Sequence, residues 1–345
     1  MSTVQKSVTI HEVASRADVS LKTVSRVINN EPSVHPKTRA RVLEIISELD
    51  YRPNLNARGL AGDRSFLIGL FCGAPGDYVS EFQIGAVERC RESGYHLMVE
   101  PWDTNSPAIA EQINKFLGQI RLDGVILLPP LGDNPIILEK LQAAGVPIIR
   151  ISPMTPLASS PSVGIDDYRA ARDMTAHLLS LGHRRIGFIL GRGDHGTTEQ
   201  RRRGFVDELL ARGVKADPAL FVPGNFEYPD GLIAAERLLN LDQPPTAIFA
   251  SNDDTAVAAM TVARKRGMSL PDDLSVAGFD DVPIASMVWP MLTSVRQPVI
   301  AMAKFAVNLI IENSPRRNGW PTPIPHHLLD FELVIRGSTT APAAR

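Results

Sequence analysis

Polar residues at the expected ends of two strands and at the start of one helix have the types to bind a ligand. Ser251-Asn252-Asp253-Asp254 and Asp280-Asp281 each follow a short apolar run, and Arg201 stands near the expected start of a helix. A guanidinium grouped with carboxylate and carboxamide groups can clamp neighbouring hydroxyls, because a hydroxyl donates to an acid and accepts from a guanidinium or amide. This combination indicates a sugar site. The alternative, that Asn252 and Asp280 only cap a helix or shape a turn, stays open.

The elements that must position these residues begin at residue 66, where apolar runs bounded by glycine and proline alternate with helical stretches. The expected strands are 66–72, 95–100, 124–128, 147–151, 185–190, 247–250 and 274–278. Uninterrupted apolar strands are typical of parallel sheets covered on both faces, and so many elements predict two doubly wound α/β lobes. Ligands of such sheets bind beyond the carboxyl ends of the strands.

The composition limits the class of protein. A chain of 345 residues with 44% hydrophobic and 21% charged residues exceeds one ordinary domain and can bury a sizeable core. It has no long apolar run and no secretory signal at its start, so we expect a cytoplasmic protein with no membrane partner. The only cysteines, Cys72 and Cys90, are expected in a strand and a helix as free thiols.

Charge is spread unevenly along the chain. Residues 1–62 contain nine Lys and Arg against six acids, whereas the remainder contains 27 basic and 32 acidic residues. A mildly basic head joined to an acidic body is compatible with phosphate binding by the head. Alone, an excess of three charges is equally typical of a solvated surface.

Three short helices are predicted in the head. A capping box at Thr9 to Glu12 begins the first, Ser20 caps a second over Leu21–Ile28, and Pro36 follows His35 at the start of a third. The second helix should turn its valines inward and leave Leu21, Lys22, Ser25 and Arg26 largely free. Two short helices at a tight turn predict a helix-turn-helix, although periodicity fits a three-helix cap on an enzyme equally well.

The segment 54–62 has helix formers and a terminal glycine, but it is too short to be a stable helix alone. Gly59 lowers its helix propensity further, by roughly 1 kcal/mol relative to alanine. We therefore expect this hinge segment to fold only on DNA.

The head residues resemble those of a known family. Matching positions include Val8-Thr9-Ile10, Val13-Ala14, Ala17, Val19-Ser20, Thr23 to Asn29, Thr38-Arg39, Tyr51, Pro53-Asn54, Ala57-Arg58 and Leu60. This run resembles the signature of the lactose-repressor/galactose-repressor (LacI/GalR) family.

The resemblance implies that Leu21–Ile28 is a recognition helix in the major groove, with Leu21, Lys22 and Arg26 facing bases. It places the following residues near phosphates: Thr9, Ser20, Thr23, Ser25 and Asn29. Leu60 would wedge between base pairs from the minor groove, with Asn54 and Arg58 beside it. Each position has a simpler reading, for example Leu21 as a core contact and Lys22 as a solvated side chain.

For the body, the resemblance implies a periplasmic-binding-protein fold whose chain crosses between lobes near 163, 297 and 327. The expected domains are 1–53 (helix-turn-helix), 54–62 (hinge) and 64–340 (effector binding and dimerisation). The implied effector-binding residues are Arg201, Asn252 and Asp280, with Tyr78, Thr197 and Gln297 ranked lower. Ser152 and Val299 depart from the family's commoner acid and aromatic residues, so the effector's identity does not carry over.

Together these features predict an allosteric, homodimeric repressor of a carbohydrate-utilisation operon that binds double-stranded operator DNA and a small sugar. No cofactor, catalytic residue or metal is expected, and the tail after Arg336 lacks leucine heptads for a larger assembly. The rivals are a cytoplasmic enzyme and a transport-type sugar binder. The sequence lacks G-x-S-x-G, phosphate-loop and H-E-x-x-H patterns, which argues against the first. The added head argues against the second.

Overall fold

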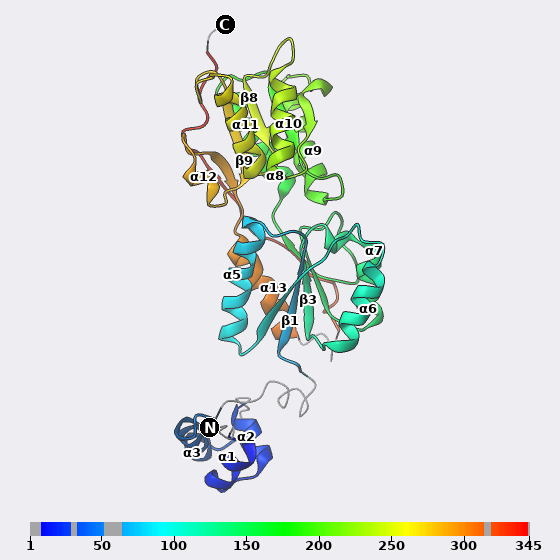
Figure 1. Cartoon of the computed structure of the whole chain (residues 1–345), viewed down its shortest axis with the longest axis vertical. Coiled ribbons are helices and arrows are strands. Elements are labelled where there is room, and N and C mark those ends of the chain that lie inside the picture. The colour runs from blue at the N-terminus through cyan, green and yellow to red at the C-terminus, as the bar shows by residue number, and fades with distance from the viewer. Residues whose placement is uncertain (1–7, 29–32, 52–63, 314–318, 344–345) are drawn as a thin grey trace, which may run out of the picture. The chain divides into compact units, whose positions relative to one another are not determined.

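The computed structural model describes residues 8–28, 33–51, 64–313 and 319–343. It divides into two compact units, Met1–Phe66 and Leu67–Arg345 (Figure 1). Among the described residues, no helix is long and apolar enough to cross a lipid bilayer. The predicted hinge at 54–62 lies outside the described residues, so the proposed domain boundaries stay a prediction.

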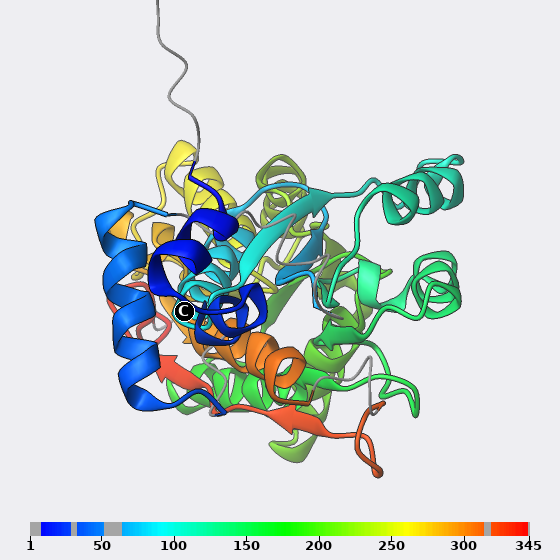
Figure 2. The same ribbon diagram turned by 90° about the horizontal axis from the view of Figure 1, so that it is seen from below.

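The smaller unit contains the three predicted helices, gathered around one core (Figure 2). They are α1 (Ile10–Ala17), α2 (Leu21–Ile28) and α3 (Pro36–Glu48). Asp18 ends α1 with a φ of 53°, and Ser20 Oγ accepts from the Thr23 amide at 3.2 Å to cap α2. His35 Nδ1 accepts from the Lys37 amide at 3.3 Å, which confirms His35 as the cap of α3.

The first lobe of the larger unit is built on a wholly parallel sheet with strand order β11-β5-β4-β3-β1-β2. Its strands are β1 (Leu67–Cys72), β2 (His96–Pro101), β3 (Gly124–Leu127), β4 (Ile148–Ile151), β5 (Ser162–Gly164) and β11 (His326–Leu328). Its helices are α5 (Asp77–Glu92), α6 (Ile109–Gln119), η1 (Leu131–Asp133), α7 (Pro135–Ala143) and α13 (Val299–Asn313). Helices α5 and α13 cover one face and α6 and α7 the other (Figure 1).

The second lobe repeats this plan with strand order β12-β10-β9-β8-β6-β7, in which only β12 is antiparallel. Its strands are β6 (Ile186–Leu190), β7 (Phe221–Pro223), β8 (Ala247–Ala250), β9 (Ser275–Asp280), β10 (Thr293–Arg296) and β12 (Glu332–Val334). Its helices are α8 (Asp167–Ser180), α9 (Gly196–Ala211), η2 (Pro218–Leu220), α10 (Tyr228–Leu239), α11 (Asp253–Lys265) and α12 (Ile284–Met287). The expected α/β architecture with two wound lobes is confirmed.

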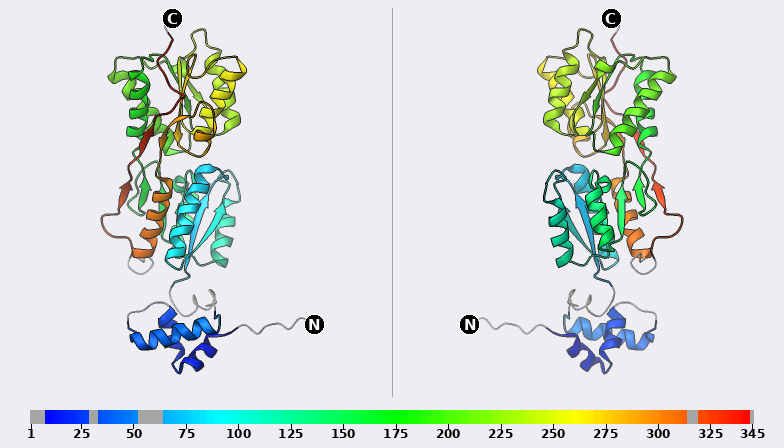
Figure 3. Two further views of the ribbon diagram at one scale, coloured as in Figure 1. Left: turned by 90° about the vertical axis from the view of Figure 1, so that its left-hand side faces the viewer. Right: turned by 90° about the vertical axis from the view of Figure 1, so that its right-hand side faces the viewer.

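The chain passes between the two sheets three times (Figure 3). The passages join β5 to α8, β10 to α13, and β11 to β12, beside the expected positions 163, 297 and 327. Counted along the chain within each lobe, the strands of both sheets lie side by side in the order second, first, third, fourth, fifth. This order has a topological switch point beside the first strand of each lobe. Loops at the carboxyl ends of the strands are therefore placed to form a ligand site.

Five strands were not predicted: β5, β7, β10, β11 and β12. Four of them have only three residues each, and β10 (Thr293–Arg296) is mostly polar, so none forms an apolar run that stands out in the sequence. On α2, Ser25 and Arg26 are half-buried rather than largely free, because both lie on the side of α2 next to its buried valines. Leu21 and Lys22 are exposed as expected.

Candidate functional site

A cavity of about 600 Å³ lies between the two lobes, at the carboxyl ends of both sheets. All six predicted effector residues line it: Tyr78, Thr197, Arg201, Asn252, Asp280 and Gln297. They come from α5, α9 and the ends of β8, β9 and β10. Its volume lies within the range of small-molecule sites in proteins. The structure thus brings together residues that are up to 219 positions apart in the sequence.

Arg201 is held in one orientation by its surroundings. It is 4% exposed, its Nε donates to Asp167 Oδ1 at 2.8 Å, and its Nη1 donates to the Ser251 carbonyl oxygen. The guanidinium carbon lies 3.5 Å from the centre of the Phe279 ring. Its Nη2 lies 3.8 Å from Asp280 Oδ1, beyond hydrogen-bond distance. The arginine is therefore positioned before any ligand arrives, and Nη2 can still donate.

Asp280 ends β9 with a backbone conformation that aspartate rarely adopts, at a φ of 102°. Its Oδ1 accepts from Gln297 Nε2 at 2.7 Å. Burial raises the pKa of Asp280 to about 7, although Arg201 and the Gln297 hydrogen bond act in the opposite direction. A hydroxyl-bearing ligand would find a carboxyl group here that can change its protonation near neutral pH.

Asn252 is engaged mainly in structural contacts. Its Oδ1 caps α11 by accepting from the Thr255 amide at 3.1 Å and from Thr255 Oγ1 at 2.6 Å. Its Nδ2 donates to the Phe226 carbonyl oxygen at 2.9 Å. One N–H of Nδ2 remains for a ligand. Asn252 therefore serves mainly as a helix cap, which was the alternative to a ligand-binding role. A contact between Asn252 and an effector stays a prediction.

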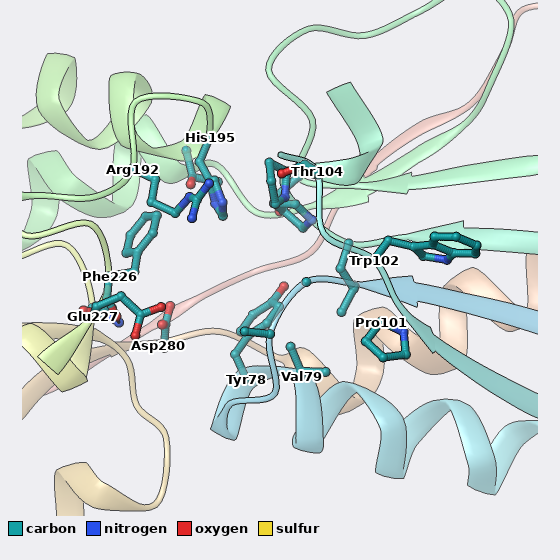
Figure 4. A pocket seen from close by; sticks show the side chains of 18 of the residues that line it. Tyr78, Val79, Pro101, Trp102, Thr104, Arg192, His195, Phe226, Glu227 and Asp280 are labelled. Atoms are coloured by element: carbon teal, nitrogen blue, oxygen red, sulfur yellow. The ribbon is translucent and has the colours of Figure 1, made fainter. Parts of the chain in front are cut away.

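Tyr78 and Thr197 complete the predicted set from opposite lobes. The Tyr78 hydroxyl extends toward the centre of the cavity from α5 (Figure 4). Burial and the nearby carboxylates of Asp280 and Asp167 raise the pKa of Tyr78, so its hydroxyl stays protonated and can donate. Thr197 is 7% exposed on the first turn of α9.

Sequence reasoning missed Arg192, His195, Phe226 and Glu227, which also line the cavity (Figure 4). Phe226 has a φ of 63°, and a Cβ on Gly191 would overlap its ring. Its ring centre lies 5.1 Å from that of His195. These residues follow β6 and β7, and the missing prediction of β7 concealed that Phe226 lies beyond a strand end.

The head presents some of its predicted DNA-binding residues at the surface. Thr9, Ser20, Leu21 and Lys22 are exposed, and Thr23, Ser25 and Arg26 are half-buried. Thr9 and Ser20 also have capping roles: the Thr9 amide donates to Glu12 Oε2 at 3.4 Å, and Ser20 Oγ lies 2.9 Å from Thr23 Oγ1. Asn29, Asn54, Arg58 and Leu60 lie outside the described residues. No cluster of metal-ligating side chains occurs in the part of the chain that the structure describes.

Two family models match the chain: bacterial regulatory proteins of the lacI family over residues 9–54, and a periplasmic binding protein-like domain over residues 175–339. The HTH-type transcriptional regulator DegA of Bacillus subtilis is 37% identical over 337 residues, covering 96% of this chain and 98% of that protein. A CelR–cellobiose complex is 30% identical with a TM-score of 0.74, covering 96% of this chain and 100% of that one.

A Lac repressor dimer bound to operator and the anti-inducer ONPF has a TM-score of 0.79. It is 28% identical and covers 97% of this chain and 100% of its own. Both the sequence match to DegA and these structural matches extend over nearly the full length, from the head through both lobes. This chain therefore belongs to the lacI family of bacterial regulatory proteins.

Proposed function

We propose that this protein represses the transcription of genes for carbohydrate use, and that a small sugar in the cavity controls its affinity for operator DNA. Family membership makes it a DNA-binding transcription regulator rather than an enzyme. The observation that carries the sugar proposal is the pairing of a fixed Arg201 with Asp280 in a cavity between two lobes. Guanidinium and carboxyl groups so placed can bind two neighbouring hydroxyls at once.

The head would bind operator DNA with α2 in the major groove. Leu21 and Lys22 are exposed at the start of α2, where side chains of a recognition helix reach base edges. Ser20 and Thr9 stand at helix starts, where hydroxyls and backbone amides can contact phosphates. The hinge residues Asn54, Arg58 and Leu60 would add minor-groove contacts.

We further propose that the protein acts as a cytoplasmic homodimer. Three large apolar side chains are exposed within one short segment after β9: Met287 at 74%, Trp289 at 75% and Met291 at 42%. Clustered exposed apolar side chains mark association surfaces. A second copy also supplies the second head that a two-half-site operator needs. The similar Lac repressor structure is itself a dimer bound to its operator, which supports the proposal.

The test begins by selecting binding sites for the purified protein from a random DNA duplex library. Fluorescence anisotropy then compares the selected duplex with a scrambled one, with and without neutral sugars ranked by thermal shift. We expect the selected duplex to bind at least about a thousandfold more tightly and a sugar to change its dissociation constant. Equal binding to both duplexes would contradict the DNA assignment, and a response only to compounds other than sugars would contradict the effector assignment.

A further inference from the structure

The loop after β9 holds Asp280 in an unusual backbone conformation. Asp280 and Asp281 have φ angles of 102° and 55°, a region that favours glycine. Two successive aspartates stay in this region only where their surroundings restrain them. The Asp281 carboxylate accepts from Arg296 Nε at 2.7 Å and from Arg336 Nη1 at 2.5 Å. These ion pairs hold the Asp281 side chain rather than the loop backbone.

Asp253, the first residue of α11, restrains the backbone of this loop. Its Oδ2 accepts from the Val282 amide at 2.9 Å. Its Oδ1 accepts from Ser294 Oγ at 2.6 Å, and Ser294 Oγ in turn accepts from the Asp281 amide at 3.2 Å. One carboxyl group therefore holds both amides that follow Asp280, the second directly and the first through a serine.

The Asp253 carboxyl lies against β9 and out of reach of a ligand. Asp253 has no exposed surface and does not line the cavity. A Cβ on Gly278 would overlap Asp253 Oδ1, so this position on β9 must be glycine for the carboxyl to fit. Burial and the neighbouring Asp280 carboxyl raise the pKa of Asp253 well above its usual range. A neutral side chain that keeps both hydrogen bonds is thus compatible with this position.

We propose that Asp253 is a positioning residue of the effector site, which holds the loop between β9 and α12 so that the Asp280 carboxyl stays beside Arg201. Asp253 does so through its two hydrogen bonds and touches no ligand. The preceding residue, Asn252, donates to the Phe226 carbonyl oxygen at 2.9 Å. The first turn of α11 thus anchors two of the loops that line the cavity (Figure 4). This role rests on the proposed function, because an effector is what Asp280 would be positioned for.

Hydrogen–deuterium exchange of the full-length protein, followed by mass spectrometry, tests the restraint without any ligand. In Asp253→Ala, peptides that contain the amides of 281 and 282 should exchange about tenfold or more faster than in the wild type, because two hydrogen bonds are lost. Asp253→Asn should stay within about threefold of the wild type, since its oxygen can accept from the Val282 amide and its N–H can donate to Ser294 Oγ. Should Asp253→Ala fail to fold, Ser294→Ala, which removes only the link to Asp281, should still speed exchange in the same peptides.

The matched control is Asp273→Ala. Asp273 Oδ2 accepts from the Ser269 amide at 2.7 Å in the loop before β9, which does not line the cavity. This variant should speed exchange at Ser269 and leave 281 and 282 as in the wild type. The inference is wrong if exchange at 281 and 282 is unchanged in Asp253→Ala, if it rises equally in Asp273→Ala, or if Asp253→Asn exchanges as fast as Asp253→Ala.

Effector binding separates positioning from mere stabilisation of the lobe. The probe is whichever of glucose, galactose, ribose, cellobiose and maltose most raises the melting temperature of the wild type. By calorimetry, Asp253→Ala should bind it about tenfold or more weakly, whereas Asp253→Asn and Asp273→Ala should bind it like the wild type. A lower melting temperature with unchanged affinity would overturn the inference, because Asp253 would then only stabilise the lobe. If none of the five sugars binds, the proposed sugar function fails, while hydrogen exchange still decides whether Asp253 holds the loop.

Discussion

Gly196, the first residue of α9, lies directly against the backbone of Met154, although the two residues belong to different lobes. A Cβ on Gly196 would overlap the Cα and backbone nitrogen of Met154. The loop that carries Met154 is held firmly, because Asp133 Oδ2 accepts from the Met154 amide at 2.8 Å and the buried Arg150 donates to the Thr155 carbonyl oxygen at 2.7 Å. The approach of the two lobes at this point thus requires glycine.

We therefore expect Gly196→Ala to disfavour this close approach of the two lobes. The added methyl meets backbone, which cannot move aside like a flexible side chain, and such overpacking costs about 1–3 kcal/mol. Effector affinity measured by calorimetry should fall by about tenfold or more. The control is Gly118→Ala on α6, where a Cβ meets no atom within 4 Å. Unchanged effector affinity in Gly196→Ala would show that the contact between Gly196 and Met154 plays no part in effector binding.

Arg26→Ala should weaken binding to the selected operator by about 1–3 kcal/mol, as expected for a lost base contact, and leave effector affinity unchanged. Lys22→Ala should instead alter which operator sequences are preferred. Anisotropy titrations on selected and random duplexes distinguish these effects. An equal loss on both duplexes would mean that Arg26 contacts only phosphates.

The raised pKa of Asp280 predicts a pH dependence of stability. Between about pH 4 and 7, the folded protein keeps a proton on Asp280 that the unfolded chain releases, so this group lowers stability progressively as pH rises through that window. Above about pH 7 its contribution is constant. Chemical denaturation from pH 5 to 8 should show a smaller fall for Asp280→Asn than for the wild type.

Asp217→Asn is the control for this measurement, because the Arg185 guanidinium holds the pKa of Asp217 below its usual range. Asp217 stays ionised throughout pH 5 to 8, so this variant should follow the wild-type pH profile. Parallel profiles of Asp280→Asn and the wild type would show that the Asp280 carboxyl does not titrate in this range.

Trp289→Asp should dissociate the proposed dimer. A carboxylate in an apolar contact between two copies would be desolvated without a partner, which is strongly unfavourable. Multi-angle light scattering should give the monomer mass for Trp289→Asp and the dimer mass for Leu210→Asp, a control at a residue 57% exposed on α9. A dimer that survives Trp289→Asp would place the interface elsewhere.

Periodicity predicted the two lobes. The ends of the expected strands, together with the family resemblance, predicted the grouping of Arg201 with Asp280, because parallel strands bring their carboxyl ends to one edge. The conformations of loops could not be predicted in this way. Phe226 reaches the cavity through two successive residues of positive φ, Asn225 and Phe226. Gly224 begins that turn, but neither of the two positive-φ positions is itself a glycine, so the sequence does not reveal where the Phe226 side chain goes. The role of Asn252 depends on the same loop, since its Nδ2 bonds to the Phe226 carbonyl.

A ligand held by Arg201 and Asp280 should control the affinity of the head for operator DNA. The most direct measurement is the operator dissociation constant of the wild type and of Asp280→Ala, each with and without saturating sugar. The wild-type constant should change with sugar, since a ligand that favours one conformation shifts the equilibrium toward it. Asp280→Ala should bind the operator like the unliganded wild type and show no response to sugar. A normal response in Asp280→Ala would contradict both the site and its coupling to the head.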